Sequence, residues 1–393
     1  MLRLIRSLKK YQSGHLPLYH ISVVVLFWAI ADGITSFVLP IFLKQVLKDL
    51  FLVGLVFASS SVFGIMADFY YGSEQKGKTF KPYFYLSLLL ALLAYVLILF
   101  ANSWFIFLIV MAFWGVYYQS LNFSIVDFVG RFSKKWEHAQ FSGVINMFSS
   151  LGYLIAPLIA GYMILQGRIS MMAAIFFMIL SGLSFLFWFS KKKVVPEPPK
   201  RKLSFAKELK IWLKVGKKSF WVLIGGYLIN TWDSLVWSMG PILLLTTLGT
   251  KGAFVMACFS IPKVFLQGYA GKLADKKGKK QFVFLGILIA GIFLSLFSFG
   301  NSLLFKMFMA LGSAVGVAFF LPAADGLLID MVSDFKQDEE EIAGLRGFSY
   351  DLAYVINPIV AGLLGSVIGL PATFLFFGAF LVFGAVLIKL LWR

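Results

Sequence analysis

The feature that most constrains this chain is a series of about twelve long apolar runs separated by short polar breaks. A helix that crosses a bilayer needs about 20 mostly apolar residues, and each run reaches that length. The runs cover residues 20–43, 50–71, 82–101, 104–129, 139–165, 169–190, 219–246, 251–273, 281–300, 303–331, 344–367 and 370–391. The sequence therefore predicts an all-α polytopic membrane protein with 12 transmembrane helices.

Composition excludes the other broad classes. Of 393 residues, 60% are hydrophobic and 14% are charged, and the mean hydropathy is +0.86. Soluble domains are about 45–50% apolar and about 25% charged, so a soluble enzyme, a disordered chain and a fibrous repeat are excluded. The single cysteine, Cys258, cannot form an intramolecular disulfide. The first run has no clear cleavage site after it, and we interpret it as an uncleaved span.

The net charge of +18 is distributed very unevenly over the predicted loops. With the N-terminus placed inside, 30 of the 36 Lys and Arg residues fall in inside segments and four in outside loops. Basic residues concentrate in cytoplasmic loops of membrane proteins. We therefore expect cytoplasmic termini in a plasma (inner) membrane, and no binding of nucleic acid.

One connection is long. Residues 191–218 contain three prolines and then a basic amphipathic stretch, 203–213, which we expect to lie on the anionic inner membrane surface. This divides the chain into an N-terminal half at 1–190, a linker at 191–218 and a C-terminal half at 219–393.

The two halves repeat one another. The pattern Asp-x7-Pro occurs at Asp32–Pro40 and again 201 residues later at Asp233–Pro241. The pattern Pro-x3-Gly occurs at Pro157–Gly161 and at Pro358–Gly362, with the same offset. Both halves begin inside, so the repeat is parallel, with an axis along the membrane normal.

A third repeated segment carries a family resemblance. Residues 271–280 match the G-x-x-x-D-x-x-G-[RK] loop signature of the major facilitator superfamily, and 64–72 is a degraded first copy in which Gly72 comes one residue late. Residues 152–161 resemble that family's g-x-x-x-G-P-x-x-G-G antiporter motif, with Ala at two Gly positions. Drug and proton antiporters of the family often carry an Arg in span four, whereas run 104–129 has neither Arg nor Lys.

The resemblance implies an alternating-access transporter of two six-helix halves, and it suggests roles for the motif residues. Cytoplasmic gating is expected of Gly64, Asp68, Gly271, Asp275, Gly278, Lys279 and Arg346. The aspartates would contact helix starts in the other half, near His138 and Arg346. The alternative is that they only cap tight turns. Helix packing is expected of Gly152, Pro157, Gly161, Pro358 and Gly362.

Ionisable residues at membrane depth are rare and mark candidate functional sites. Here they are Asp32, Asp233, Lys263, Asp325 and Asp351. Helical spacing adds polar or aromatic neighbours on the same faces, which should point inward: Trp28, Tyr118, Gln119, Asn122, Asn230 and Trp237. In the resembled family, spans one, four, seven and ten line the central cavity.

Two readings of these charges stay open. A carboxylate in a partly dry cavity favours its protonated form, so Asp32 could alternate between proton and substrate. It could instead be structural, and for Asp233 the two readings are even. Lys263 follows Pro262, where we expect a kink, and would pair with Asp233 or Asp351 or contact substrate.

The predicted function is secondary active transport of a small solute, with protons as coupling ion and export or antiport as direction. The alternatives are a proton-coupled importer of a small polar solute and a transporter-like lipid-handling or sensor protein. An enzyme is not expected: the three histidines are scattered, and no ATP-binding glycine loop is present. We expect no cofactor, metal or catalytic residue, and a monomer whose partners are substrate, protons and membrane lipid.

Overall fold

The computed structural model describes residues 2–74, 79–133, 138–163, 167–190, 205–334 and 339–392, and these residues form helices and no strand. The first half contains α1 (Leu2–Leu47), α2 (Leu50–Glu74), α3 (Phe80–Phe100), α4 (Trp104–Phe132), α5 (His138–Met163) and α6 (Gly167–Phe189). The second contains α7 (Phe205–Ser238), α8 (Gly240–Leu248), η3 (Gly249–Lys251), α9 (Gly252–Cys258), α10 (Ile261–Lys277), α11 (Lys279–Leu296), α12 (Leu303–Asp334), α13 (Glu339–Val367) and α14 (Leu370–Leu391). The all-α prediction is confirmed.

Eleven stretches of the described chain are long and apolar enough to cross a membrane. The predicted seventh run, 219–246, is absent from that set. Polar residues in the middle of this run, among them Asn230, Thr231 and Asp233 of α7, lower its mean hydropathy. Its last residues, in α8, join α9 and α10 in one stretch, Gly240–Lys277. Polar residues that face the interior of the helix bundle thus lower the hydropathy by which a membrane span is recognised in the sequence.

The eighth span is broken where its proline falls. α9 ends at Cys258 and α10 begins at Ile261, with Pro262 in its first turn. Proline lacks an amide hydrogen and is tolerated at a helix start, so the helix restarts there. The predicted kink at Pro262 is confirmed, and it places Lys263 at the beginning of α10.

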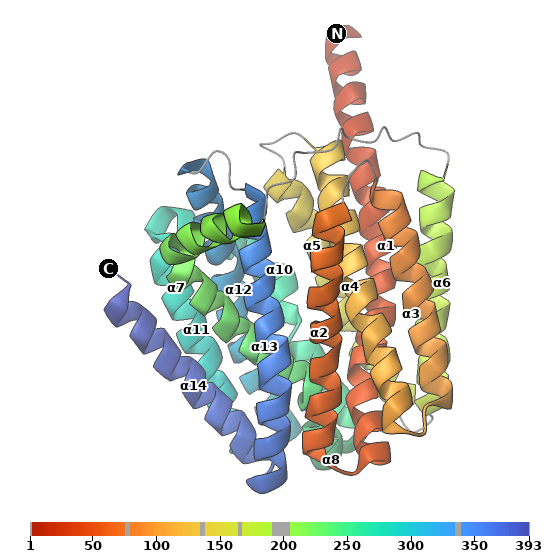
Figure 1. Ribbon diagram of the computed structural model, residues 1–393, viewed down its shortest axis with the longest axis vertical. Coiled ribbons are helices and arrows are strands. Elements are labelled where there is room, and N and C mark those ends of the chain that lie inside the picture. Colours follow the sequence, from red (N-terminus) through yellow and green to blue (C-terminus); the bar gives the residue numbers. More distant parts are fainter. Residues whose placement is uncertain are drawn as a thin grey trace.

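The linker predicted at 191–218 lies only partly within the described residues. Residues 191–204 lie outside the described ones, but α7 already begins at Phe205 and runs without interruption into the membrane-spanning part. Figure 1 shows this first part of α7 lying across the top of the C-terminal half before the helix turns downward. The basic N-terminal segment likewise continues α1 from Leu2.

Figure 1 shows the two halves side by side, with α2 and α13 adjacent at their boundary. Within the first half, α1 packs on α5 and α6, and α3 packs on α4; within the second, α11 packs on α12 and α14, and α7 on α13. An aromatic cluster holds α3, α4 and α6 together, including the stacked rings of Phe84 and Phe185, 3.9 Å apart.

The halves meet tightly at the end where α1 connects to α2, which the predicted topology places outside. A Cβ added at Gly54 or Gly362 would collide with the backbone of the other half, at Pro358 and Leu50 respectively. Gly161 packs in the same way on Ala253 of α9. Small residues therefore let helices of the two halves approach closely and close this end.

Some glycines toward the opposite end have no such neighbour. No described atom lies within 4 Å of a Cβ added at Gly130 of α4, Gly143 of α5 or Gly347 of α13, so these three positions are not close contacts between described helices.

Candidate transport site

Asp32 lies at the centre of a buried hydrogen-bond network in the N-terminal half. Its carboxyl group is 2% exposed and accepts hydrogen bonds from Tyr117 Oη at 2.6 Å and from Tyr153 Oη at 2.7 Å. Ser36 Oγ, one helical turn along α1, approaches at 3.5 Å. Three helices, α1, α4 and α5, therefore position this carboxyl group with neutral donors, and none of the three described donors is a cation.

A cavity of about 100 Å³ adjoins this network between the same three helices. Its wall combines aromatic rings with amide and hydroxyl groups: Val25, Trp28, Tyr118, Leu121, Asn122, Ile125, Ile145, Asn146, Ser149 and Tyr153. The rings of Trp28 and Tyr118 lie 5.9 Å apart. The buried indole N–H of Trp28 has no hydrogen-bond partner among the described residues, and a bound acceptor would relieve that cost.

The network of Asp32 reaches the other half through Tyr153. The hydroxyl group of Tyr153 donates to Asp32, while its ring lies 5.6 Å from the ring of Trp237 on α7. A movement of the two halves against each other would therefore disturb the side chain that donates to Asp32.

The C-terminal half holds a related but more open site. Asp233 of α7 accepts a hydrogen bond from Tyr354 of α13, and Lys263 Nζ lies 4.0 Å from its second oxygen. The side chains of Asp233 and Lys263 are 29% and 15% exposed. Lys263 also lies over the ring of Trp232, at 5.6 Å. The structure thus places Lys263 beside Asp233, one of the two partners that the sequence suggested.

Not every polar residue on that face is directed to the site. Asn230 donates to the carbonyl oxygen of Gly226 in its own helix. The neighbouring Thr231 instead accepts a hydrogen bond from Asn357 of α13 at 2.8 Å. α7 and α13 are therefore joined by a second polar contact beside the Asp233–Tyr354 pair.

A second group of carboxyls joins the two halves nearer the cytoplasmic end. Asp351 of α13 accepts hydrogen bonds from Gln119 Nε2 of α4, at 3.2 and 3.4 Å. The carboxyl group of Asp68 of α2 lies close enough to that of Asp351 for the two to interact. Gly64 packs on the Gln119 side chain, at 3.6 Å from an added Cβ.

The loop signature at 271–280 forms contacts within the C-terminal half. Lys279 Nζ lies 2.8 Å from Asp330 on α12 and 3.6 Å from Asp275, whose side chain is 68% exposed. Gly278 has a φ of +103°, which glycine adopts readily, and it turns the chain from α10 into α11. Gly271 packs on Pro322 of α12.

The contacts that these aspartates were expected to make with the other half are only partly visible. Asp68 does reach α13, at Asp351, whereas the side chains of Arg346 and His138 lie outside the described residues. Among the described residues, Asp275 forms an ion pair with Lys279 of its own half. The gating roles therefore stay predictions.

The span-five motif divides its contacts between the halves. Gly152 packs on Ala29 of α1, within the first half, whereas Gly161 packs on Ala253 of the second. In α13, the related Pro358 and Gly362 meet α2. Pro157 lies inside α5 without ending the helix.

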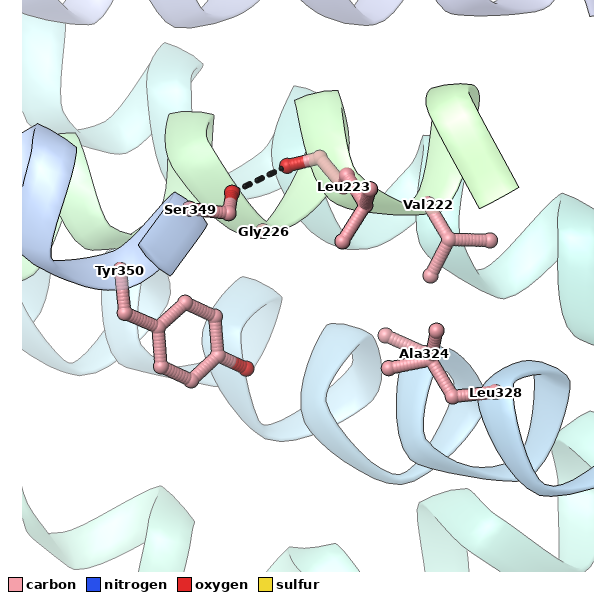
Figure 2. A pocket seen from close by; sticks show the side chains of 7 residues that line it. All are labelled: Val222, Leu223, Gly226, Ala324, Leu328, Ser349 and Tyr350. Atoms are coloured by element: carbon pink, nitrogen blue, oxygen red, sulfur yellow. Dashed lines mark hydrogen bonds between the residues drawn. The ribbon is translucent and has the colours of Figure 1, made fainter. Parts of the chain in front are cut away.

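Two remaining features carry less chemistry. Asp325 lies in α12, which contributes no residue to either Asp–Tyr pair, and it interacts with other groups. Figure 2 shows a small pocket between α7, α12 and α13, lined by Leu223, Gly226, Ser349, Tyr350 and neighbours, where Ser349 donates to the Leu223 carbonyl. At about 10 Å³ it has room for about one water molecule.

Sequence reasoning missed three tyrosines that the structure brings to the carboxyl groups: Tyr117, Tyr153 and Tyr354. The signal for two of them was present. Tyr153 and Tyr354 are separated by 201 residues, the same offset that relates Asp32 to Asp233. Tyr117 has no such signal, because α12 contains no tyrosine.

The fold and this site define a helical membrane protein with two similar halves and polar residues between them. The Major Facilitator Superfamily model matches residues 21–251 and 233–393. The chain therefore belongs to the major facilitator superfamily, and it is an integral membrane protein.

Among curated proteins, the chain is similar to Multidrug resistance protein 1 of Bacillus subtilis (strain 168), with 25% identity over 140 residues, 35% of each chain. It is also similar to the quinolone resistance protein NorA of Staphylococcus aureus (strain MRSA252), with 23% identity over 155 residues, 39% of each chain. The matched segments thus span little more than a third of these relatives.

Solved structures extend the likeness in fold over the whole chain. A POT family transporter in complex with 5-aminolevulinic acid gives a TM-score of 0.78 at 13% identity, covering 95% of both chains. The D323A mutant of the nucleoside transporter NupG gives 0.78 at 13% identity, covering 96% of this chain and 100% of the other. The predicted fold class is confirmed.

Proposed function

We propose that this protein is a proton-coupled antiporter that exports small aromatic or amphipathic solutes, with Asp32 as the proton carrier. The observation that carries the proposal is the position of Asp32. A carboxyl group buried in the membrane interior, beside a cavity and held by neutral donors alone, can exist as a neutral acid or as a hydrogen-bonded carboxylate.

The cavity supports the substrate class. The rings of Trp28, Tyr118 and Tyr153 offer stacking surfaces, and Asn122, Asn146 and Ser149 offer hydrogen bonds. Relatives named for multidrug and quinolone resistance fit a site of this chemistry. The contact of Tyr153 with Trp237 gives a physical route from the movement of the halves to the carboxyl group.

Coupling follows from the shared donors. When Asp32 is charged, Tyr117 and Tyr153 satisfy it; when the halves rearrange, the Tyr153–Trp237 contact changes and the donor set of Asp32 changes with it. A change in the donors favours one protonation state over the other. Alternating access then releases the proton on one side and the solute on the other.

The test uses proteoliposomes with a fluorescent aromatic cation, ethidium, as probe. Accumulation driven by an acidic lumen indicates antiport, whereas accumulation driven only by an acidic exterior indicates import with protons. The second result would favour the alternative, a proton-coupled importer of a polar solute, which the amide groups of Asn122 and Asn146 could also serve. Ethidium movement that ignores the pH gradient would contradict proton coupling.

Orientation belongs to the same proposal. We place both termini in the cytoplasm of an inner (plasma) membrane, because 30 of 36 basic residues lie on that side. A cysteine placed in the loop after α2 and one at Lys251, each in a Cys258→Ser background, should be labelled by an impermeant maleimide from opposite faces of the membrane.

A further inference from the structure

A chain of amide and carboxyl groups leads from the cavity wall to the contact between the two halves. Asn122 of α4 lines the cavity and donates from Nδ2 to Gln119 Oε1 at 3.1 Å. Gln119, one turn earlier on the same helix, donates from Nε2 to both carboxyl oxygens of Asp351 on α13. Asp351 in turn contacts Asp68 of α2.

The geometry fixes the orientation of the Gln119 amide. An amide group has a carbonyl face and an NH₂ face, and the hydrogen-bond network decides which way each points. Because Asn122 donates to Oε1, the NH₂ group of Gln119 is turned toward Asp351. Two contacts hold this orientation, the donation from Asn122 to Oε1 and the donation from Nε2 to Asp351, and loss of the Asn122 donor removes one of them.

Burial raises the energetic cost of losing the Gln119–Asp351 contact. Gln119 is 9% exposed and packs on Gly64, so a misdirected amide has little water to compensate it. Asn122, by contrast, is exposed toward the cavity side. The buried member of the chain joins the two halves, and the exposed member is the one that a solute can reach.

We propose that Gln119 is a latch between the two halves and that Asn122 is its positioning residue, so that occupation of the cavity is transmitted to the α4–α13 contact. A solute that draws the Asn122 amide toward itself frees the Gln119 amide to turn and weakens the latch. The proposal goes beyond proton coupling at Asp32, since no atom of that network takes part in it.

The experiment measures the two halves directly and needs no solute. Spin labels at Gly130→Cys on α4 and Lys277→Cys on α10, in a Cys258→Ser background in nanodiscs, report the distance between the halves by pulsed electron paramagnetic resonance. Both positions are exposed. The quantity compared among variants is the population ratio of the present arrangement to the alternative one.

Gln119→Met keeps the shape and removes the latch, and it should lower this ratio by about 3- to 10-fold, the range expected for one hydrogen bond between membrane helices. Asn122→Leu should lower it in the same direction. The double variant should lower it no further than Gln119→Met alone, because Asn122 acts through Gln119. Asn122→Gln, which retains the amide donor, should stay within about twofold of the parent.

Asn146→Leu is the matched control, since Asn146 is a second amide in the same cavity wall and lies outside the described hydrogen bonds of Gln119, which join it to Asn122 and Asp351. It should leave the ratio unchanged. Asp351→Leu removes the Gln119–Asp351 hydrogen bond from the other half. It keeps the test decisive if the Gln119 variant fails to fold. An unchanged ratio in both Gln119→Met and Asp351→Leu would overturn the latch. Additive effects of Gln119→Met and Asn122→Leu, or equal effects of Asn122→Leu and Asn146→Leu, would overturn the positioning role.

Discussion

The two halves of this protein contain the same pair of residues in different surroundings. Asp32 and Tyr153 lie 121 residues apart in the first half, and Asp233 and Tyr354 lie 121 residues apart in the second. In both pairs a tyrosine on the fifth membrane span of the half, α5 or α13, donates a hydrogen bond to an aspartate on the first span, α1 or α7. The pairs are therefore copies of one structural unit.

What surrounds each pair differs. Asp32 is buried and has a second tyrosine, whereas Asp233 is partly exposed and faces Lys263. No basic residue stands in α2 of the first half, and no tyrosine in α12 of the second. A cation compensates a carboxylate without a proton, but neutral donors leave the charge buried. The two halves thus share one Asp–Tyr unit, and under the proposed function Asp32 would carry the proton whereas Asp233 pairs with a cation.

The largest difference is expected between the two aspartates themselves. Asp32→Asn should lower ethidium transport driven by a pH gradient by about 100-fold or more, as loss of a proton-transferring group does. Asp233→Asn should retain most of the coupling, because Asp233 is charge-paired. Initial rates in proteoliposomes at matched protein content measure both. Equal losses of transport rate in the two variants would contradict the proposal that Asp32, and not Asp233, carries the proton.

A smaller difference is expected between the two tyrosines. Tyr153→Phe removes one donor from the buried carboxyl group and should slow pH-driven transport by about 10-fold and alter its pH profile, the scale of one hydrogen bond to a charged group. Tyr354→Phe should slow transport less and leave the profile unchanged, because Lys263 still faces Asp233. A pH profile that changes only in Tyr354→Phe would reverse the assignment.

The smallest effect concerns the lysine that has no counterpart in the first half. Lys263→Gln leaves Asp233 without a cation, and at a 4.0 Å separation with partial exposure the loss should be about 1 kcal/mol. Thermal unfolding in detergent measures it. The double variant Lys263→Gln/Asp233→Asn should recover most of that stability, because no unpaired charge remains. A double variant less stable than Lys263→Gln would show that the two residues do not compensate each other.

Much of the fold could be predicted because bilayer physics leaves few choices. Run length gave the helices, and the kink at Pro262 followed from the missing amide hydrogen of proline. The seventh span was predicted from its loop context, although its polar residues keep α7 out of the set of plainly apolar helices. The basic amphipathic stretch predicted at 203–213 coincides with the first part of α7, which begins at Phe205, but the pattern alone did not show that this stretch continues into the seventh span as one helix.

The sequence could group candidate site residues only where they lie on the same helix. Spacing placed Asp32 and Trp28 on one face, and the repeat offset could have added Tyr153 and Tyr354. Contacts between helices far apart in sequence, such as Gln119 with Asp351, depend on how α4 and α13 pack, which no local pattern encodes. The same holds for Tyr117, which reads as one more aromatic residue in an aromatic-rich chain.

The most direct test of the division between the halves is proton release from purified protein in lightly buffered detergent solution, followed with a pH indicator dye as ethidium is added. Wild type and Asp233→Asn should release protons in step with ethidium binding, and Asp32→Asn should bind ethidium without releasing them. Undiminished release from Asp32→Asn would contradict the account, because the proton would then be carried elsewhere.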